Sequence, residues 1–193
     1  MDMDDLALIQ QKKDLRKMLK EKRKHLDASY CREADRKIRL ILQSAKVYQE
    51  AELIFCYVSM EGEPETRQFI QEALDQGKRI AVPRCREKGR MDACEIRSLD
   101  DLEPGAFGIW EPKAECPLAE PEKLQVCVVP CLSCSGDGIR LGYGGGYYDR
   151  FLPMTEAVRI ILCRAQMLCR EIPVQPHDCK MDILITETGF TVL

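Results

Sequence analysis

Residues 138–150 carry the residue types best suited to chemistry in this chain, and they read Gly-Ile-Arg-Leu-Gly-Tyr-Gly-Gly-Gly-Tyr-Tyr-Asp-Arg. Five glycines fall within nine positions of this segment. Glycine serves packing poorly, because it costs backbone entropy and buries no side chain. It does allow positive φ angles and a close approach of backbone N–H groups, which can then form a nest for phosphate oxygens. The segment therefore predicts a phosphate-binding loop.

Charged and aromatic side chains flank these glycines. Arg140 offers a permanent charge with bidentate reach for phosphate, and the helix expected after the loop would present its positive end to the same site. Asp149, one turn into that helix, can hold a magnesium ion together with water and phosphate oxygens. Tyr147 and Tyr148 offer flat faces and hydroxyl groups to an aromatic ligand. A flexible loop anchored by tyrosines is the alternative interpretation.

Other candidate residues lie far from this loop in the sequence. Lys12 and Arg16 are four residues apart, so on a helix they share one face and can grip one polyphosphate; a solvated basic face is the alternative. Glu63 follows an expected buried strand across a loop, which is where binding residues gather. Asp178 and Asp182 precede the last expected strand, and on their own they are equally typical of surface acids.

The hydrophobic pattern predicts the elements that must position these residues. Helical spacing of apolar residues favours helices over 6–26, from an N-cap at Ser29 to about residue 45, and from Pro64 to a C-cap at Gly77. A short helix is expected after the glycine loop. Short apolar runs favour strands at 53–58, 79–82 (ended by Pro83), 93–96, 126–129, 158–163 and 183–186.

Strands separated by helices predict an α/β fold. We expect one domain over residues 1–193, a three-layer sandwich with a mostly parallel, Rossmann-like sheet and the N-terminal helices packed on it. In such sheets ligands bind beyond the carboxyl ends of the strands, which is where the candidate loops fall.

Composition sets limits on partners. The chain carries a net charge of -3, but residues 12–39 hold twelve basic and five acidic residues, which gives this segment +7 and the remainder -10. A basic region on an acidic body suggests an anionic ligand. No apolar stretch approaches the ~20 residues of a membrane helix, and the acidic start, Met1-Asp2-Met3-Asp4-Asp5, is unlike a secretory signal. We expect a cytoplasmic monomer that binds neither nucleic acid nor membrane.

Two other classes of protein are alternatives. Cys127, Cys131 and Cys134 fall within eight residues, which would suit a zinc or iron–sulfur site if a fourth ligand were close. The eleven cysteines otherwise read as reduced, buried residues of an intracellular protein. The basic N-terminal region could bind RNA, but it lacks interleaved aromatic residues.

The segment from Arg140 to Arg150 strongly resembles the central motif of the 5-formyltetrahydrofolate cyclo-ligase family, and the resemblance covers nearly the whole chain. Further elements that resemble the family are Lys12-x-x-Leu15-Arg16, Tyr57-x-Ser59-x-x-x-Glu63-x-x-Thr66, Gly105-x-x-Gly108-Ile109-x-Glu111-Pro112, and a tail with His177-Asp178, Asp182 and Thr186-Glu187.

This resemblance implies an enzyme that uses ATP and Mg2+ to convert 5-formyltetrahydrofolate, with or without a polyglutamate tail, to 5,10-methenyltetrahydrofolate. It gives catalytic roles to Arg140 and Tyr148, folate contacts to Val58, Glu63 and Tyr148, and magnesium ligation to Asp149 and Asp178. The implied ATP site comprises Lys12, Arg16, Arg140, Leu141, Gly142, Tyr143, Gly144, Gly145, Gly146, Tyr147 and Tyr148. Another ATP-using or sugar-phosphate enzyme on the same sheet is the alternative within enzymes.

The chain departs from the family pattern in two places. Where the family commonly reads Gly-Leu-Ala-Phe-Asp, this chain has residues 131–135, Cys-Leu-Ser-Cys-Ser, so an aromatic and an acid are missing, although Asp137 is near. Gly145 stands where many relatives have a lysine, which leaves the phosphate charge to Arg140, Lys12 and Arg16.

Overall fold

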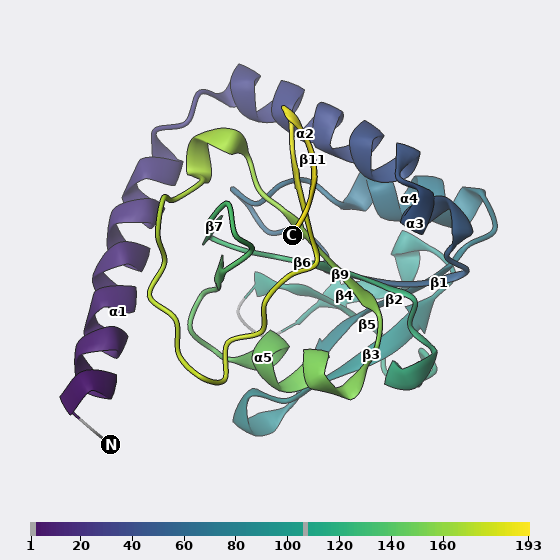
Figure 1. The fold of residues 1–193 in the computed structure, drawn as a ribbon. Coiled ribbons are helices and arrows are strands. Elements are labelled where there is room, and N and C mark those ends of the chain that lie inside the picture. Colours follow the sequence, from purple (N-terminus) through teal and green to yellow (C-terminus); the bar gives the residue numbers. More distant parts are fainter. Residues whose placement is uncertain (1–2, 106–107) are drawn as a thin grey trace.

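A seven-stranded sheet forms the centre of the computed structural model, which describes residues 3–105 and 108–193 (Figure 1). Its strands follow the order β11-β10-β9-β6-β1-β2-β3. Their bounds are β1 Leu53–Cys56, β2 Arg79–Cys85, β3 Met91–Ile96, β6 Val126–Val129, β9 Val158–Leu162, β10 Ile183–Thr186 and β11 Gly189–Val192. The five inner strands are parallel, and the two edge strands, β3 and β11, run antiparallel to their neighbours.

The central strands are buried on both faces. Every residue of β1 and β6 is buried, as expected for short, continuously apolar strands with cover on each side. The α/β fold with a mostly parallel sheet, predicted from these runs, is confirmed.

Three helices cover one face of the sheet: α2 (Ala28–Ser44), α3 (Lys46–Glu50) and α4 (Arg67–Asp75). The buried residues of α2 are Ala34, Ile38 and Leu42, whose four-residue spacing places them on one side of the helix. They share a core with Phe69 and Ile70 of α4 and with the side chains of the strands that point the same way. Figure 1 shows α2 and α4 on the same side of the sheet.

The opposite face is covered by less regular structure. The short helix α5 (Tyr147–Phe151) and a small antiparallel pair, β7 (Ser133–Cys134) and β8 (Arg140–Leu141), lie on this side. Phe151 packs against Phe55 of β1, with ring centroids 4.7 Å apart. This core therefore places the glycine loop, between β8 and α5, beside the end of a central strand.

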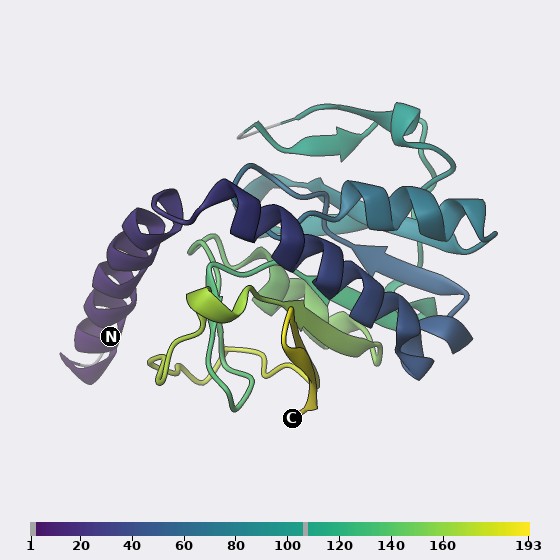
Figure 2. The same cartoon turned by 90° about the horizontal axis from the view of Figure 1, so that it is seen from above.

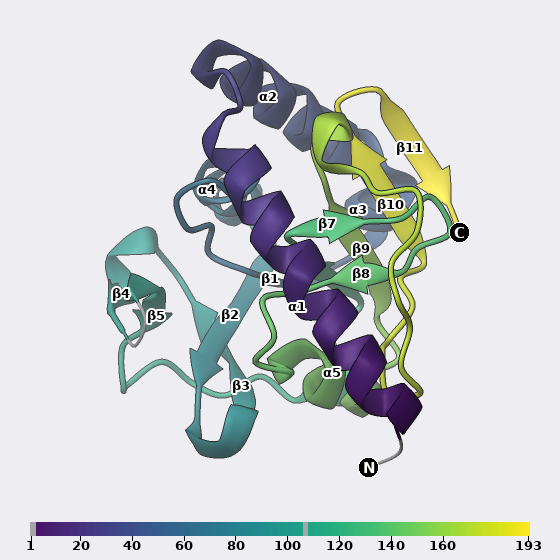
Figure 3. The same ribbon diagram turned by 90° about the vertical axis from the view of Figure 1, so that its left-hand side faces the viewer.

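Helix α1 (Met3–Lys24) does not lie on a face of the sheet, which corrects part of the prediction. It runs across the ends of the strands, in front of β1, β7 and β8 (Figure 3). Leu19 is its one fully buried apolar side chain among the described residues, because the charged residues leave no continuous apolar stripe. The helix is therefore available to line a site at the carboxyl ends of the strands.

Three predicted boundaries are wrong for local reasons. Asp27, not Ser29, caps α2, because its carboxylate accepts the backbone N–H of Tyr30. Helix α4 begins after Thr66, and Pro64 belongs to the preceding loop. Strand β2 continues through Pro83. A proline is tolerated there because the pairing of β2 with β1 has already ended at Ala81.

A separate hairpin stands apart from the main sheet, formed by β4 (Leu102–Pro104) and β5 (Trp110–Pro112) (Figure 2). It contains the family-like element that starts at Gly105, although residues 106–107 of that element lie outside the described part, as do Met1 and Asp2 of the acidic start. In the described ranges, no helix combines the length and apolar character needed to cross a bilayer.

Candidate active site

A cavity of about 780 Å3 opens where α1, the glycine loop and the loop after β1 meet. Every residue that the sequence analysis assigned to ATP, folate or magnesium lines this cavity. These residues come from four separate parts of the chain: α1, residues 57–63, residues 140–149 and the segment near 178. The structure therefore brings together what the sequence places far apart.

Helix α1 gives one face to the cavity. Ile9, Lys12, Arg16 and Lys20 recur every three or four residues and line it together. Lys12 is only 4% exposed and its Nζ lies 2.5 Å from a carboxylate oxygen of Asp178. Arg16 donates from Nε to the carbonyl oxygen of Gly142 at 2.8 Å. Burial lowers the pKa of Arg16, and the charge of Arg140 acts in the same direction.

The glycine loop uses backbone conformations that favour glycine. Gly144 has φ of +103° and Gly146 has φ of +67°, a region that residues with a side chain rarely adopt. Tyr143 anchors the loop to α1, since its hydroxyl accepts a hydrogen bond from Arg23 at 2.7 Å. Residues 142–148 of the loop line the cavity, which suits a ligand that approaches backbone N–H groups closely.

Arg140 is buried at the base of this loop. Its guanidinium donates to Asp149 at 2.8 Å and lies over the ring of Tyr148, 5.5 Å from the centroid. Its Nε is buried and has no hydrogen-bond partner among the described residues. A buried donor without a partner costs free energy unless a ligand or water completes it, so this arginine has capacity for an anion.

Helix α5 is short, as expected from the sequence. It spans five residues and continues into a 3-10 turn at Leu152–Met154. A helix this short has a small macrodipole, so the expected contribution of its N-terminus to phosphate binding stays a prediction. The backbone of the loop and the basic side chains remain as phosphate-binding groups.

The loop after β1 closes on itself and presents Glu63. Ser59 and Thr66 exchange hydrogen bonds, each backbone N–H donating to the other's hydroxyl at 3.0 to 3.1 Å. The Thr66 hydroxyl also donates to the carbonyl oxygen of Tyr57. The family-like residues Ser59 and Thr66 are therefore structural, and the loop they close places Glu63 and Val58 at the cavity.

Glu63 is a buried acid, 5% exposed. Burial raises its pKa, while the backbone N–H of Met60, the hydroxyl of Tyr143 and the charges of Arg23 and Arg164 partly oppose this effect. One carboxylate oxygen accepts the N–H of Met60 at 2.9 Å. An acid kept in an apolar cavity near other polar groups is typical of a ligand-binding or catalytic position.

Two carboxylates, Asp149 and Asp178, reach the cavity as possible magnesium ligands. Within residues 3–105 and 108–193, no group of three or more His, Cys, Asp or Glu side chains is arranged to hold a metal ion. A pair of carboxylates suits Mg2+ that takes its other ligands from phosphate and water. The cysteine-ligated alternative, in contrast, needs more ligands than the described residues provide.

The segment that departs from the family pattern is part of the core. Cys131 and Cys134 are buried, and the hydroxyl of Ser133 donates to the carbonyl oxygen of Met167 at 2.6 Å. Asp137 is exposed and bonded to Ser135, and it is not among the residues that line the cavity. It therefore does not replace the missing acid.

The rest of the cavity wall was not assigned from the sequence. These additional residues are Ile9, Lys20, Tyr57, Met60, Pro83, Cys85, Met91, Ile109, Pro130, Gln175 and His177. The helical spacing of Lys12 and Arg16 extends to Ile9 and Lys20, so that signal was present in the sequence. Tyr57 and His177 belong to elements that resemble the family, but Pro83, Cys85 and Met91 reach the cavity only through the pairing of β2 with β3.

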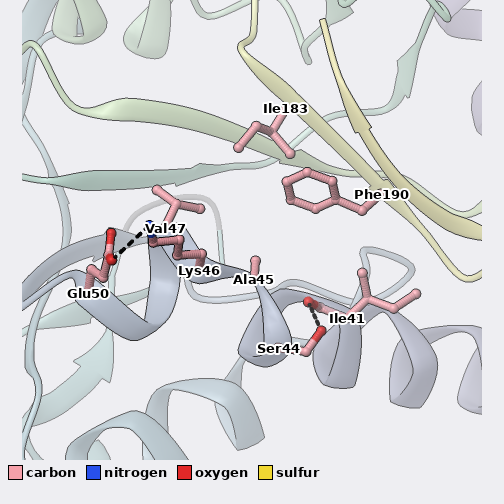
Figure 4. A pocket seen from close by; sticks show the side chains of 8 residues that line it. All are labelled: Ile41, Ser44, Ala45, Lys46, Val47, Glu50, Ile183 and Phe190. Atoms are coloured by element: carbon pink, nitrogen blue, oxygen red, sulfur yellow. Dashed lines mark hydrogen bonds and ion pairs between the residues drawn. The ribbon is translucent and has the colours of Figure 1, made fainter.

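A second hollow of about 590 Å3 lies between the end of α2, α3 and the β10–β11 hairpin (Figure 4). Ile41, Val47, Ile183 and Phe190 give it an apolar lining. Its charged residues, Lys46 and Glu50, pair with each other on the surface. It offers no buried titratable group, so the first cavity is the candidate active site.

The chain is similar to known proteins over nearly its whole length. A family model described as the 5-formyltetrahydrofolate cyclo-ligase family matches residues 8–187. The chain is 29% identical to 5-formyltetrahydrofolate cyclo-ligase of Mus musculus, over 91% of this chain and 93% of the relative. It is 29% identical to a probable 5-formyltetrahydrofolate cyclo-ligase of Caenorhabditis elegans, over 77% of this chain and 79% of the relative. The solved structure of Aquifex aeolicus 5,10-methenyltetrahydrofolate synthetase superposes with a TM-score of 0.84 and 28% identity, over 94% of this chain and 92% of that chain.

Proposed function

This chain belongs to the 5-formyltetrahydrofolate cyclo-ligase family, and from that premise we propose that it uses ATP and Mg2+ to convert 5-formyltetrahydrofolate to 5,10-methenyltetrahydrofolate, with release of ADP and phosphate. One observation carries the proposal: a phosphate-type glycine loop, four Lys or Arg side chains and two carboxylates line the same cavity as the buried acid Glu63. A site for a polyphosphate and a site for a polar heterocycle are thus side by side.

The residues at the glycine loop fit a magnesium-bound triphosphate. Arg140 has an unpartnered Nε, and Gly144 and Gly146 have positive φ angles, a conformation that suits close approach of backbone N–H groups to phosphate. Lys12 and Arg140 each pair with one of the two carboxylates. We expect both cations to turn to phosphate oxygens when the nucleotide binds, while Asp149 and Asp178 turn to Mg2+, so that no charge is left without a partner.

The folate would occupy the part of the cavity near Glu63. Tyr57, Val58 and Met60 give this part an apolar wall, which suits the flat pterin ring. The carboxylate of Glu63 can accept hydrogen bonds from ring N–H groups, and such contacts in an apolar setting fix orientation strongly. Tyr148 lines the cavity from the side of the glycine loop, between this region and Arg140.

The chemistry requires alignment more than covalent help from the protein. The formyl oxygen of the N5 amide attacks the γ-phosphorus and ADP leaves. N10 then attacks the activated formyl carbon, loses its proton, and phosphate leaves as the ring closes. Holding the two substrates in line and neutralising charge on the moving phosphoryl group are the main catalytic contributions in such transfers. Arg140, Lys12 and Arg16 are placed to supply that charge.

The test is direct. The purified chain, incubated with ATP, Mg2+ and 5-formyltetrahydrofolate, should develop the absorbance of the methenyl product and release one ADP for each product formed. Leaving out ATP, or removing Mg2+ with a chelator, should abolish both signals. Failure to form the product would refute the proposed function, and product formation without ATP consumption would refute the phosphorylation step.

A further inference from the structure

Arg164 lies outside the cavity but is bonded to the loop that carries Glu63. It follows β9 and precedes the 3-10 turn η6 (Ala165–Met167). Its side chain is 5% exposed, and it is not among the cavity-lining residues. Nη1 donates to the carbonyl oxygen of Gly62 at 2.9 Å, and Nη2 donates to the carbonyl oxygen of Glu63 at 2.8 Å.

A second set of contacts holds Arg164 itself in place. Nε and Nη2 donate to the two carboxylate oxygens of Asp35 on α2, at 2.7 and 2.8 Å. This is the bidentate arrangement that fixes the plane of a guanidinium. The next residue, Ala165, donates its backbone N–H to Glu187, which also accepts from Tyr30. The support of Arg164 is therefore tied to α2 and to the end of β10.

The loop that Arg164 holds is a tight turn. The backbone N–H of Glu63 donates to the carbonyl oxygen of Met60 at 3.1 Å, and the N–H of Met60 donates back to the Glu63 carboxylate at 2.9 Å. Gly62 has φ of +83°, and an added Cβ would lie 3.0 Å from Nε of Arg23. The turn is thus confined between α1 on one side and Arg164 on the other.

Glu63 needs such an anchor because its position is costly. A buried carboxylate loses hydration that a solvent-exposed loop would restore. If the loop were held only by its own turn, moving this side chain into water would lower the free energy of the chain. Two charge-assisted hydrogen bonds to consecutive carbonyl groups oppose that movement, and such bonds are stronger than bonds between neutral groups.

We propose that Arg164, held by Asp35, is the positioning residue that keeps Glu63 in the folate-binding part of the cavity. The inference rests on the proposed function only for the identity of the ligand at Glu63. It predicts that Arg164 controls folate binding and leaves nucleotide binding unchanged, since its side-chain hydrogen bonds in the described residues go to Asp35, Gly62 and Glu63 and none goes to the glycine loop.

The experiment compares Arg164→Met with Arg39→Met. Both substitutions remove a largely buried arginine from an ion pair that involves α2. Arg164 pairs with Asp35 of α2, whereas Arg39 of α2 pairs with Glu72 of α4 and is not among the cavity-lining residues. Arg164→Met should raise the KM for 5-formyltetrahydrofolate on the order of ten- to a hundredfold, as lost alignment commonly does, with the KM for ATP unchanged. Hydrogen exchange of the backbone of residues 57–66 should become faster. Arg39→Met should show neither effect.

Each alternative result has a meaning. An unchanged KM for the folate together with unchanged exchange would overturn the proposal, and so would a parallel rise of both KM values with faster exchange throughout the chain. If Arg164→Met does not fold, Arg164→Lys, which keeps charge without the planar fork, must show the same selective effects at smaller size. If the wild-type chain forms no methenyl product, the proposed function fails, while faster exchange confined to residues 57–66 still supports the anchoring.

Discussion

Replacing Arg140 by methionine separates the catalytic role proposed for this residue from its role in the ion pair with Asp149. Methionine keeps an unbranched side chain and removes the guanidinium that pairs with Asp149 at 2.8 Å. If Arg140 neutralises charge on the transferred phosphoryl group, its loss should lower kcat by about 10²–10³-fold, the usual effect of removing one preorganised donor.

The stability of the fold should fall as well, for a separate reason. Removing one member of a buried ion pair costs about 3–5 kcal/mol, because the other charge is left without a partner. The side chain of Asp149 remains 19% exposed, so water can compensate part of this cost, and we expect a decrease in the free energy of unfolding near the lower end, about 2–3 kcal/mol.

A double variant distinguishes the two effects. Arg140→Met combined with Asp149→Asn removes the unpaired charge, so urea unfolding should return to within about 1 kcal/mol of the wild type. Turnover, followed by the absorbance of the methenyl product, should stay low. Arg86→Met is the control, because it breaks an exposed pair with Asp92 (49% and 36% exposed) and should change stability by less than about 1 kcal/mol. Near-normal kcat in Arg140→Met, or recovery of kcat in the double variant, would refute the reasoning.

Two further predictions concern buried titratable groups. Burial raises the pKa of Glu63 above its usual 4.5, so the folded chain keeps that proton to higher pH than the unfolded chain, and the residue lowers the free energy of unfolding as pH rises through this interval. Glu63→Gln should therefore gain stability relative to the wild type as the pH rises above 4.5, measured by urea unfolding; a constant difference would contradict this. Burial also raises the pKa of Cys127 and Cys134 to about 12. Iodoacetamide at neutral pH should thus label the partly exposed Cys31 and Cys169 first, as read by peptide mass spectrometry, and early labelling of Cys127 or Cys134 would argue against their burial.

The sequence predicted the parallel core because its strands are short apolar runs with no competing pattern. Strand β11 was not predicted, since Gly189–Val192 is mostly exposed and its alternation of Phe190, Thr191 and Val192 is too short to indicate a strand. The β4–β5 hairpin and the β7–β8 pair were missed for the same reason: two or three residues carry no periodicity. Helix caps were misplaced because Asp27 and Ser29 are equally good N-cap residues in sequence, and only the hydrogen bond to Tyr30 separates them.

The site residues were predictable where composition is unusual. The glycine loop is recognisable because five glycines fall within nine positions, and the face of α1 follows from helical spacing. The partners of these residues were not predictable, since Lys12 meets Asp178 across 166 positions and Arg164 meets Asp35 across 129. Such pairs depend on how the sheet brings loops together, which no local pattern encodes.

The charges of the cavity suggest a role for Asp149 and Asp178 both before and after ligands bind. The charge of Arg140 acts to lower the pKa of Arg16, and without anions nearby this cluster of cations would destabilise the fold. Asp149 and Asp178 supply those anions through the pairs with Arg140 and Lys12. A triphosphate alone would take the cations and leave both carboxylates facing its own negative charge, whereas Mg2+ would give them a new partner. If the proposed function holds, we therefore expect nucleotide and Mg2+ to bind together more tightly than either one alone.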